Sequence, residues 1–406
     1  MAALRTTGPL RRELQAAVPD RPFRLTFWDG TEVPPSNGGP APTLHLRSPA
    51  ALAHALRAPG QLGLGRAYVS GELEVDDLEA VLEMLDRYRP RPIDRGAQLR
   101  LALAAARAVG PMRPPPVPEI ELRPRGERHS PERDKRSVRH HYDVSNDFFA
   151  LFLDESMTYS CAFFSRDGSS LEAAQTAKLE LTSAKLAMRE GERVLDVGCG
   201  WGSFAIHAAR EHGVSVTGIT LSEPQAELAR RRAEEAGVAD RVEIRVMDYR
   251  ELADEPYDAI ASIGMVEHVG SNRIDEYAAT LARLLRPGGR LLNHGISRLR
   301  IGEPEAGPFS ERYVFPDAAP LHLSRIQIAL ERAGLETNHV EGFREDYAET
   351  LTHWMRRLDE HAVEAERLAG PERLRVWRLY LRAARNGFRT GFTSIYQVRC
   401  VKPGPR

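Results

Sequence analysis

Glycines at 198, 200 and 202 separate an apolar strand-like run from an apolar helical segment, in the sequence RVLDVGCGWGSFAIHAA (193–209). Glycine allows a turn to come close to a ligand, and the free N–H groups at a helix start bind electronegative atoms. Asp196 lies inside the apolar run, where a carboxylate is costly to bury unless something binds it. The spacing differs from the dinucleotide pattern Gly-x-Gly-x-x-Gly, and no Lys-Ser/Thr follows as in a nucleoside triphosphate loop. The segment therefore predicts a ligand-binding turn of another kind.

The heptapeptide DVGCGWG (196–202) is similar to the loop with which Rossmann-like methyltransferases bind S-adenosylmethionine (SAM). A glycine-rich turn that binds no ligand is the alternative. In such sites the second strand commonly ends in an acid that binds the ribose hydroxyls. Here the tip is GITLSEPQ (218–225), with no acid in that place, so Thr220 and Gln225, which can donate and accept hydrogen bonds, are the candidates, together with Leu221.

The third strand ends in Met-Asp-Tyr and supplies two more candidates. Asp248 suits the amino group of an adenine, and Tyr249 suits stacking on its ring, although simple core packing explains Tyr249 equally well. The predicted cofactor site therefore includes residues from three successive strand ends, namely Asp196, Gly198, Gly200, Gly202, Thr220, Leu221, Gln225, Asp248 and Tyr249.

Alternating strands and helices from residue 137 onward must position these residues. Strands are expected at 193–197, 214–221, 242–249, 257–264, 289–297 and 393–402, and helices end near 210 and cover 222–237 and 274–289. This alternation predicts an α/β fold, a parallel sheet with helices on both faces and ligands at the strand carboxyl ends. Together with the glycine loop it indicates a class I (Rossmann-like) SAM-dependent methyltransferase domain over 137–406. Residues 300–390 read as a mostly helical insertion, a common place for a substrate lid.

The first 90 residues predict a smaller α+β accessory domain. FRLTFWDGTEV (23–33) alternates apolar and polar residues around Asp29-Gly30, which is typical of a hairpin. Segments 48–57 and 78–88 have helical periodicity. Residues 91–136 are rich in proline and arginine and contain one short helical stretch, so we expect a linker there.

Composition excludes several classes. The 406 residues have a formal net charge of −1, which argues against a general nucleic-acid partner. The sequence contains no run of about 18 apolar residues, so we expect no membrane-spanning helix. The N-terminus has no apolar core of signal-peptide length. Cys161, Cys199 and Cys400 are odd in number and far apart, which suits a reducing compartment and disfavours disulfides and a zinc finger. We expect a cytoplasmic protein.

Several further motifs, in their order and spacing, resemble the cyclopropane-fatty-acyl-phospholipid synthase family, which includes the mycolic acid cyclopropane synthases. The resemblance covers nearly all of residues 137–400, and the segment GLGRAYVSGELEVDDLEAVLEML (63–85) is similar to the extra domain of the phospholipid-acting members. The motifs are HHYDVSNDFFALFLDESMTYSCAFF (140–164), SIGMVEHVG (262–270), LLNHGIS (291–297), ERYVFPDAAPL (311–321) and FREDYAETLTHW (343–354).

The resemblance implies that a cis double bond of a phospholipid acyl chain attacks the SAM methyl group, and that proton loss from the added methyl closes a cyclopropane ring. It implies a bound bicarbonate ion as general base, held by Cys161, Glu267, His294, the backbone of Ile296, and Tyr347. It also adds Tyr159 and Ser160 to the cofactor site. An alkene has no proton to remove first, so the catalyst must align it, exclude water and stabilise positive charge. Core packing of His294 and a plain buried thiol at Cys161 are the alternatives.

An enzyme acting on acyl chains must reach a membrane surface, and two basic segments are candidates. Arginines decorate the apolar stretch LALAAARAVG (101–110) and alternate with aromatic residues in 373–389, a pattern typical of helices that bind anionic lipid. A charged helix with one face on the core is the alternative. The residues are Arg100, Arg107 and Arg113 in the first segment, and Arg373, Arg375, Arg378, Arg382, Arg385, Arg389, Trp377, Leu379, Tyr380 and Phe388 in the second.

The product and the partners stay open at this point. A methylene branch is the alternative to a cyclopropane ring, and it would call for a flavin- or NADPH-dependent reductase to give a methyl branch. Val266 stands where many synthases have Phe, which assigns neither product. We expect a peripheral location on the inner face of the cell membrane and a homo-oligomer, a dimer. A methyltransferase of a soluble small molecule and a lipid-binding protein that retains a SAM fold are the rival functions.

Overall fold

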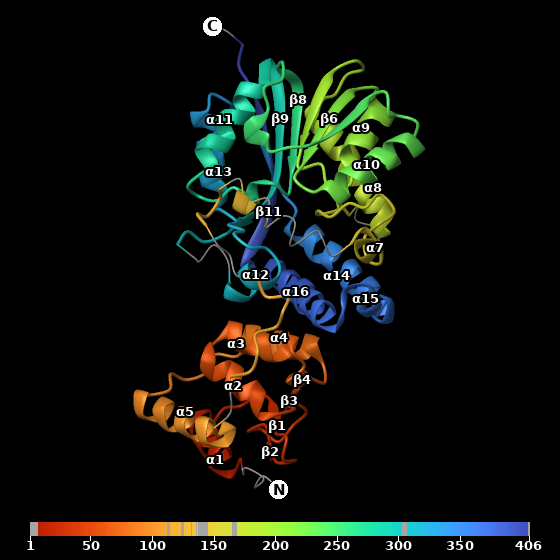
Figure 1. Cartoon of the computed structure of the whole chain (residues 1–406). Helices are drawn as coiled ribbons and strands as arrows, with labels where there is room; N and C mark the ends of the chain where they lie inside the picture. Colours follow the sequence, from red (N-terminus) through yellow and green to blue (C-terminus); the bar gives the residue numbers. More distant parts are fainter. Residues whose placement is uncertain are drawn as a thin grey trace. The chain divides into compact units, whose positions relative to one another are not determined.

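Two compact units make up the chain, and the computed structural model describes residues 7–111, 114–122, 126–130, 132–134, 136, 145–164, 169–302 and 307–404 (Figure 1). Unit 1 combines residues 1–121 with 307–309 and 370–386. Unit 2 combines 122–306, 310–369 and 387–406. These boundaries differ from the expected ones, because the helix of the expected linker and most of the last helix of the expected insertion both group with the N-terminal residues.

Unit 1 is built on a four-stranded sheet with the order β2-β1-β3-β4. β1 and β2 pair antiparallel across the Asp29-Gly30 turn, which confirms the predicted hairpin. The Asp29 carboxylate accepts hydrogen bonds from the N–H groups of Thr31 and Thr7, both at 3.1 Å. The elements are α1 (Gly8–Ala17), β1 (Arg24–Thr26), β2 (Glu32–Val33), β3 (Thr43–Leu46), α2 (Pro49–Arg57), α3 (Gln61–Val69), β4 (Leu73–Val75), α4 (Leu78–Arg87), α5 (Arg95–Val109) and α16 (Pro371–Arg389).

Helix α5 has a core face of small residues and a solvent face of leucine and arginine. Asp94 caps it by accepting a hydrogen bond from Ala97 N–H at 3.0 Å. Ala104, Ala105 and Ala108 belong to the apolar core of unit 1. On the other side Leu99 is 61% exposed and Leu103 is 46% exposed. Arg100 and Arg107 are exposed beside them, whereas Arg113 lies outside the described residues.

Helix α16 uses its central arginines inside unit 1. The Arg375 guanidinium lies 2.9 Å from a Glu74 carboxylate oxygen, and Arg382 and Arg385 both contact Glu79. Arg382 and Arg385 are buried. The expectation that these three arginines face a lipid surface is therefore wrong, because carboxylates far away in the sequence neutralise them within the fold.

Unit 2 contains a seven-stranded sheet with the order β10-β11-β9-β8-β5-β6-β7. Its strands are β5 (Arg193–Val197), β6 (Ser215–Thr220), β7 (Val242–Val246), β8 (Tyr257–Ile263), β9 (Leu285–Arg298), β10 (Glu336–Gly342) and β11 (Thr393–Val401). Its helices are α7 (Asn146–Ala150), α8 (Leu171–Leu186), α9 (Ser203–His212), η1 (Tyr249–Glu251), α10 (Glu223–Glu235), η2 (Val266–His268), α11 (Ile274–Leu284), α13 (Leu323–Arg332), α14 (Arg344–Glu360) and α15 (Ala362–Ala369), while α12 (Pro308–Tyr313) begins in the segment grouped with unit 1.

Successive residues of the central strand β5 feed two separate cores, one on each face of the sheet. Val194 packs with residues of α8, α9 and α10. Leu195 and Val197 pack with residues of α11 and α13 on the opposite face. The helices accordingly flank the sheet on both sides (Figure 1). This three-layer arrangement confirms the expected α/β class.

The sheet departs from the sequence-based expectation in three places. It is mixed rather than parallel, because the closing strand β11 runs antiparallel to both β9 and β10. Strand β10 lies within the segment expected to be mostly helical. Helix α11 ends at Leu284, and β9 begins at Leu285, ahead of the glycines expected to end the helix. Within the described residues, none of the helices has the length and apolar character needed to cross a bilayer.

Candidate active site

The turn after β5 has the backbone that only glycine adopts easily. Gly198, Gly200 and Gly202 have φ values of +80°, +53° and +81°, all in the left-handed region. The N–H groups of Gly198 and Cys199 both donate to the Ile219 carbonyl, at 3.0 and 2.9 Å, which ties the turn to the end of β6. The turn leads directly into α9, so the helix start faces the space above the strand ends.

A cavity, here called the glycine-loop cavity, opens at this edge of the sheet. All of the predicted cofactor residues except Gly202 line it, including Tyr159, Ser160, Leu221 and Tyr249. Gly202 instead faces α10, where an added Cβ would lie 3.1 Å from the Ala229 Cβ. Further lining residues that the sequence did not single out include Lys178, Trp201, Ser203, Met265, His268 and Arg250.

The polar groups at the tips of β6 and β7 are already paired with one another. The Thr220 hydroxyl donates to Gln225 Oε1 at 2.8 Å. The Asp248 carboxylate accepts from Arg250 Nε at 2.8 Å. Tyr249 packs edge-on against Tyr277, with ring centroids 5.6 Å apart, while it also lines the cavity. The roles of Asp248 and Tyr249 toward an adenine therefore stay predictions.

Asp196 is the polar group of this cavity that most needs a ligand. It is 2% exposed, and its Oδ2 has no hydrogen-bond partner among the described residues. Burial raises the pKa of Asp196 to about 7, while the positive charge of Lys178 acts in the opposite direction. A buried carboxylate oxygen without a partner suits a ligand that brings a positive charge, and SAM has both an ammonium and a sulfonium.

Lys178 is the functional residue that sequence reasoning missed. It lies on α8, is 1% exposed and donates from Nζ to the Ser160 hydroxyl at 3.1 Å. Burial lowers the pKa of Lys178 to about 8, whereas the carboxylates of Asp154 and Asp196 act in the opposite direction. Gln175, one turn earlier, donates to the Ser160 carbonyl at 2.9 Å. Together these two α8 side chains hold the segment that contains Ser160.

A second buried group, here called the Phe343 cluster, contains the residues that the family resemblance assigns to bicarbonate. Phe343 connects three of them. Its carbonyl accepts from Tyr347 N–H at 3.0 Å and from the Cys161 thiol at 3.7 Å, and its ring centroid lies 5.8 Å from that of His294. Burial raises the pKa of Cys161 well above its usual value, so this residue is a thiol rather than a thiolate.

Glu267 joins the Phe343 cluster through strand β9. Its Oε1 accepts a hydrogen bond from Ile296 N–H at 2.7 Å, and its Oε2 is buried without a partner among the described residues. Burial raises the pKa of Glu267 to about 7, although the hydrogen bond from Ile296 opposes this change. Met265 and His268, on either side of it in the chain, line the glycine-loop cavity. The η2 segment thus separates the cavity from the cluster.

His294 presents an unsatisfied N–H to the interior. Lys185 Nζ donates to Gln397 Oε1 at 2.6 Å, which fixes the orientation of the Gln397 amide. The amide nitrogen of Gln397 then donates to His294 Nδ1 at 3.4 Å, so the ring proton is on Nε2. That Nε2 is buried and has no partner among the described residues. Burial lowers the pKa of His294 to about 3, with Lys178 and Lys185 acting in the same direction, so the ring is neutral at pH 7.

Aromatic side chains link the cavity to the Phe343 cluster. Tyr159, which lines the cavity, stacks on Trp354 with ring centroids 5.1 Å apart and an interplanar angle of 23°. Trp354 in turn meets Tyr347 edge-on at 6.1 Å. Packed rings therefore run from the cavity wall to the Phe343 cluster, but none of the predicted base-binding residues lines the cavity, so their role stays a prediction.

Comparisons with known proteins agree with this arrangement. A family model described as mycolic acid cyclopropane synthetase matches residues 129–398. A probable fatty acid methyltransferase of Mycobacterium tuberculosis is 38% identical over 419 residues, covering 99% of this chain and 97% of that protein. Cyclopropane-fatty-acyl-phospholipid synthase of Escherichia coli is 32% identical over 367 residues, covering 89% of this chain and 88% of that protein.

A solved structure shares the fold of unit 2. The mycolic acid cyclopropane synthase CmaA1, described as a complex with S-adenosylhomocysteine and CTAB, is 33% identical and superposes with a TM-score of 0.63. The match covers 66% of this chain and 98% of that chain. With the glycine-loop cavity, the Phe343 cluster and these likenesses in agreement, the chain belongs to the mycolic acid cyclopropane synthetase family and is a SAM-dependent enzyme of the cyclopropane synthase and fatty acid methyltransferase kind.

Proposed function

We propose that this enzyme transfers a one-carbon unit from SAM to the cis double bond of unsaturated phospholipid acyl chains. The observation that carries the proposal is the Phe343 cluster beside the glycine-loop cavity. It contains two buried atoms, Glu267 Oε2 and His294 Nε2, that have no hydrogen-bond partner among the described residues. A methyltransferase of ordinary oxygen or nitrogen nucleophiles has no need of such a second set.

A phospholipid substrate is favoured over a mycolic acid by the extent of the likenesses. Two relatives that match along most of the chain are described as a probable fatty acid methyltransferase and a cyclopropane-fatty-acyl-phospholipid synthase. The mycolic acid cyclopropane synthase structure matches only 66% of the chain. The likeness to the phospholipid synthase therefore extends into unit 1, which supports a phospholipid substrate.

The residues of the glycine-loop cavity fit SAM. When bound, SAM supplies an electrophilic methyl group. Asp196 would face its positive charges, the glycine turn would allow close approach of the ligand, and Thr220 and Gln225 would meet its hydroxyl groups. The ring of Tyr159, which lines the cavity, would favour positive charge there because aromatic rings attract cations, and the buried walls would keep water out.

The Phe343 cluster fits a small oxyanion, and we propose bicarbonate. When bound, bicarbonate supplies a base for the proton that the alkylated chain must lose. The free Nε2–H of His294 would donate to an oxygen of the ion, and the buried Lys178 ammonium adds positive charge within electrostatic reach of both Cys161 and His294. Glu267, with a pKa of about 7, can hold a proton at Oε2. The protonated carboxyl carries no charge, so it does not repel the neighbouring anion.

Helix α5 is the surface that we propose for docking on the membrane. Leu99 and Leu103 form an exposed apolar pair flanked by Arg100 and Arg107, the pattern of a helix that lies in a lipid interface. Replacing both leucines by glutamate should abolish sedimentation with anionic liposomes. Leu85→Glu on α4, where the leucine is 52% exposed, is the matched control and should leave binding unchanged. Equal loss in both proteins would contradict docking through α5.

The function is tested by incubating the enzyme with SAM and vesicles of phospholipids with monounsaturated chains. We expect S-adenosylhomocysteine to form, and mass spectrometry of the acyl chains to show a gain of one CH₂, which proton NMR then assigns to a ring or to a methylene branch. Appearance of a methylene product would call for a reductase to complete a methyl branch. Turnover of a soluble acceptor in the absence of lipid, with unaltered acyl chains, would refute the proposal.

A further inference from the structure

Three metal-ligating side chains meet on the outside of unit 2, away from the residues discussed so far. Glu180 comes from α8, and His207 and His212 come from α9. None of the three lines the glycine-loop cavity. We propose that this group binds one Zn²⁺ ion that joins α8 to α9.

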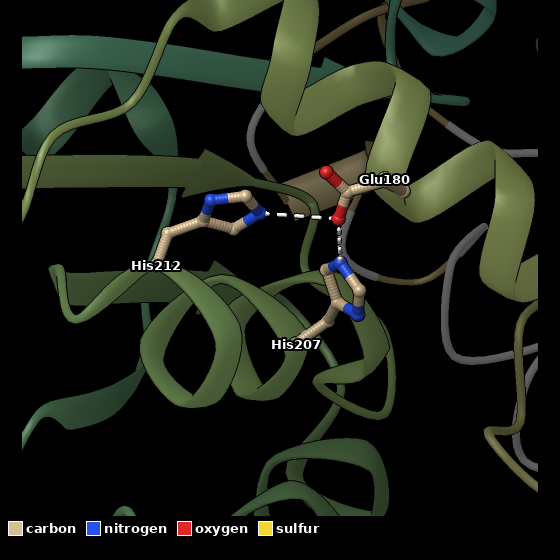
Figure 2. A group of neighbouring side chains, drawn as sticks. All are labelled: Glu180, His207 and His212. Atoms are coloured by element: carbon tan, nitrogen blue, oxygen red, sulfur yellow. Dashed lines mark hydrogen bonds and ion pairs between the residues drawn. The ribbon is translucent and has the colours of Figure 1, made fainter.

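The geometry suits a metal better than a set of hydrogen bonds. The Nε2 atoms of His207 and His212 both lie 3.3 Å from the same oxygen, Glu180 Oε2, and Figure 2 shows the two rings pointing toward it from different turns of α9. Nitrogen–oxygen hydrogen bonds are usually about 2.9–3.0 Å long. Two ligands at about 2.0–2.1 Å from a tetrahedral Zn²⁺ are separated by roughly 3.3 Å, the spacing found here.

Small side-chain movements can bring the Nε2 atoms of His207 and His212 to the separation that a shared metal ion requires. All three ligand atoms lie within 4.8 Å of one another. The His207 side chain is 8% exposed and is held by its surroundings, whereas the Glu180 side chain is 56% exposed and can adjust. The half-exposed carboxylate also leaves a path for the ion and a position for a water molecule as the fourth ligand.

The donor set selects the kind of metal. Two imidazole nitrogens and one carboxylate oxygen suit Zn²⁺ and related transition ions, whereas Mg²⁺ and Ca²⁺ take oxygen ligands almost exclusively. The three cysteines are all buried in the folded protein, so they do not compete for the ion from the surface.

The ion would have a structural role in two helices that carry or adjoin residues of the active site. α9 begins directly after the glycine turn, and α8 contains Lys178 and Gln175, which hold Ser160. A ligand from each helix fixes their separation on the outer side of the glycine-loop cavity. The inference stands apart from the proposed reaction, since it concerns stability and metal content rather than turnover.

The test uses the full chain after removal of metals by a chelator. Titration with ZnCl₂, followed by calorimetry, should show one saturable site. A Zn²⁺ concentration one hundred times the Kd should raise Tm by roughly 5 °C. Glu180→Gln and His212→Asn should each weaken binding at least about tenfold and remove the rise in Tm. Glu349→Gln, in the two-residue pair with His353 at 3.5 Å, is the matched control and should bind Zn²⁺ like the wild type.

Two results would overturn the inference. One is the absence of saturable binding, or binding that both ligand variants leave unchanged. The other is a Co²⁺-loaded protein whose spectrum has the intense near-ultraviolet absorption of a thiolate ligand, since that would place the ion on cysteine. We expect only the weak visible bands of tetrahedral Co²⁺ with nitrogen and oxygen ligands, and their loss in Glu180→Gln.

Discussion

Replacing Glu267 by glutamine should make the protein inactive and, at alkaline pH, more stable relative to the wild type. The amide keeps an oxygen that can accept the hydrogen bond from Ile296 N–H, so the local fold is retained. It cannot take up or hold a proton at the position of Oε2. General acid–base groups contribute about 100-fold or more to a rate, so we expect turnover to fall by at least that factor.

The stability effect follows from burial of the carboxylate. The pKa of Glu267 is raised from 4.5 to about 7 in the folded protein, so the folded state binds the proton more tightly than the unfolded chain. The contribution of Glu267 to wild-type stability is therefore largest at acid pH and is lost as the pH rises through 7. Between pH 5 and pH 8.5 this loss amounts to roughly 2–3 kcal/mol, and the glutamine variant does not have it.

The assay is chemical denaturation of both proteins at the two pH values, combined with S-adenosylhomocysteine formation on lipid vesicles. The difference in unfolding free energy between variant and wild type should move by roughly 2–3 kcal/mol in favour of the variant from pH 5 to pH 8.5. Glu227→Gln, at an exposed position of α10, should show no such change. A pH-independent difference, or wild-type turnover in the Glu267 variant, would refute the reasoning.

Three further substitutions test other parts of the structure. Lys178→Met removes the buried ammonium without changing side-chain length much, and we expect a fall in turnover of about 100-fold on vesicles; unchanged turnover would exclude an electrostatic role. Gly198→Ala should weaken S-adenosylhomocysteine binding in calorimetry at least about tenfold, because a side chain at φ +80° strains the turn, whereas Gly191→Ala, at φ +79° but outside the cavity, should bind normally. Glu79→Gln should destabilise unit 1 by roughly 2 kcal/mol in denaturant titrations, because it removes the carboxylate charge that Arg382 and Arg385 both contact, and wild-type stability would contradict that pairing.

The strands of the sheet could be predicted where they are buried, because a buried strand appears in the sequence as a run of apolar residues. β5, β6 and β8 are apolar runs that end at glycines or polar tips, and all three form near the expected bounds. β10, Glu336–Gly342, has no such pattern because it is an edge strand whose residues are mostly exposed. Backbone hydrogen bonds to β11 hold it in the sheet, and these do not depend on side-chain type.

The site residues that belong to sequence motifs could be predicted, and those outside the motifs could not. The glycine turn and the motifs around Glu267, His294 and Tyr347 are recognisable from the order of their residues in the sequence. Lys178 is not, since a lysine in a helix with several charged residues looks like any solvent-facing lysine. Its burial depends on how α8 lies against the sheet, together with Gln175 and Thr182, which are also buried. Likewise Arg375 reads as a membrane contact until its partner Glu74, 301 residues earlier, is found beside it.

The division of the chain into units has a consequence for synthesis. Residues 1–121 are made well before α16, which provides the partners of Glu74 and Glu79. Domains usually fold in the order in which they are translated. Here unit 1 lacks α16, and unit 2 lacks β11 between β9 and β10, until residues 371–401 have been made, so both units are completed late in synthesis.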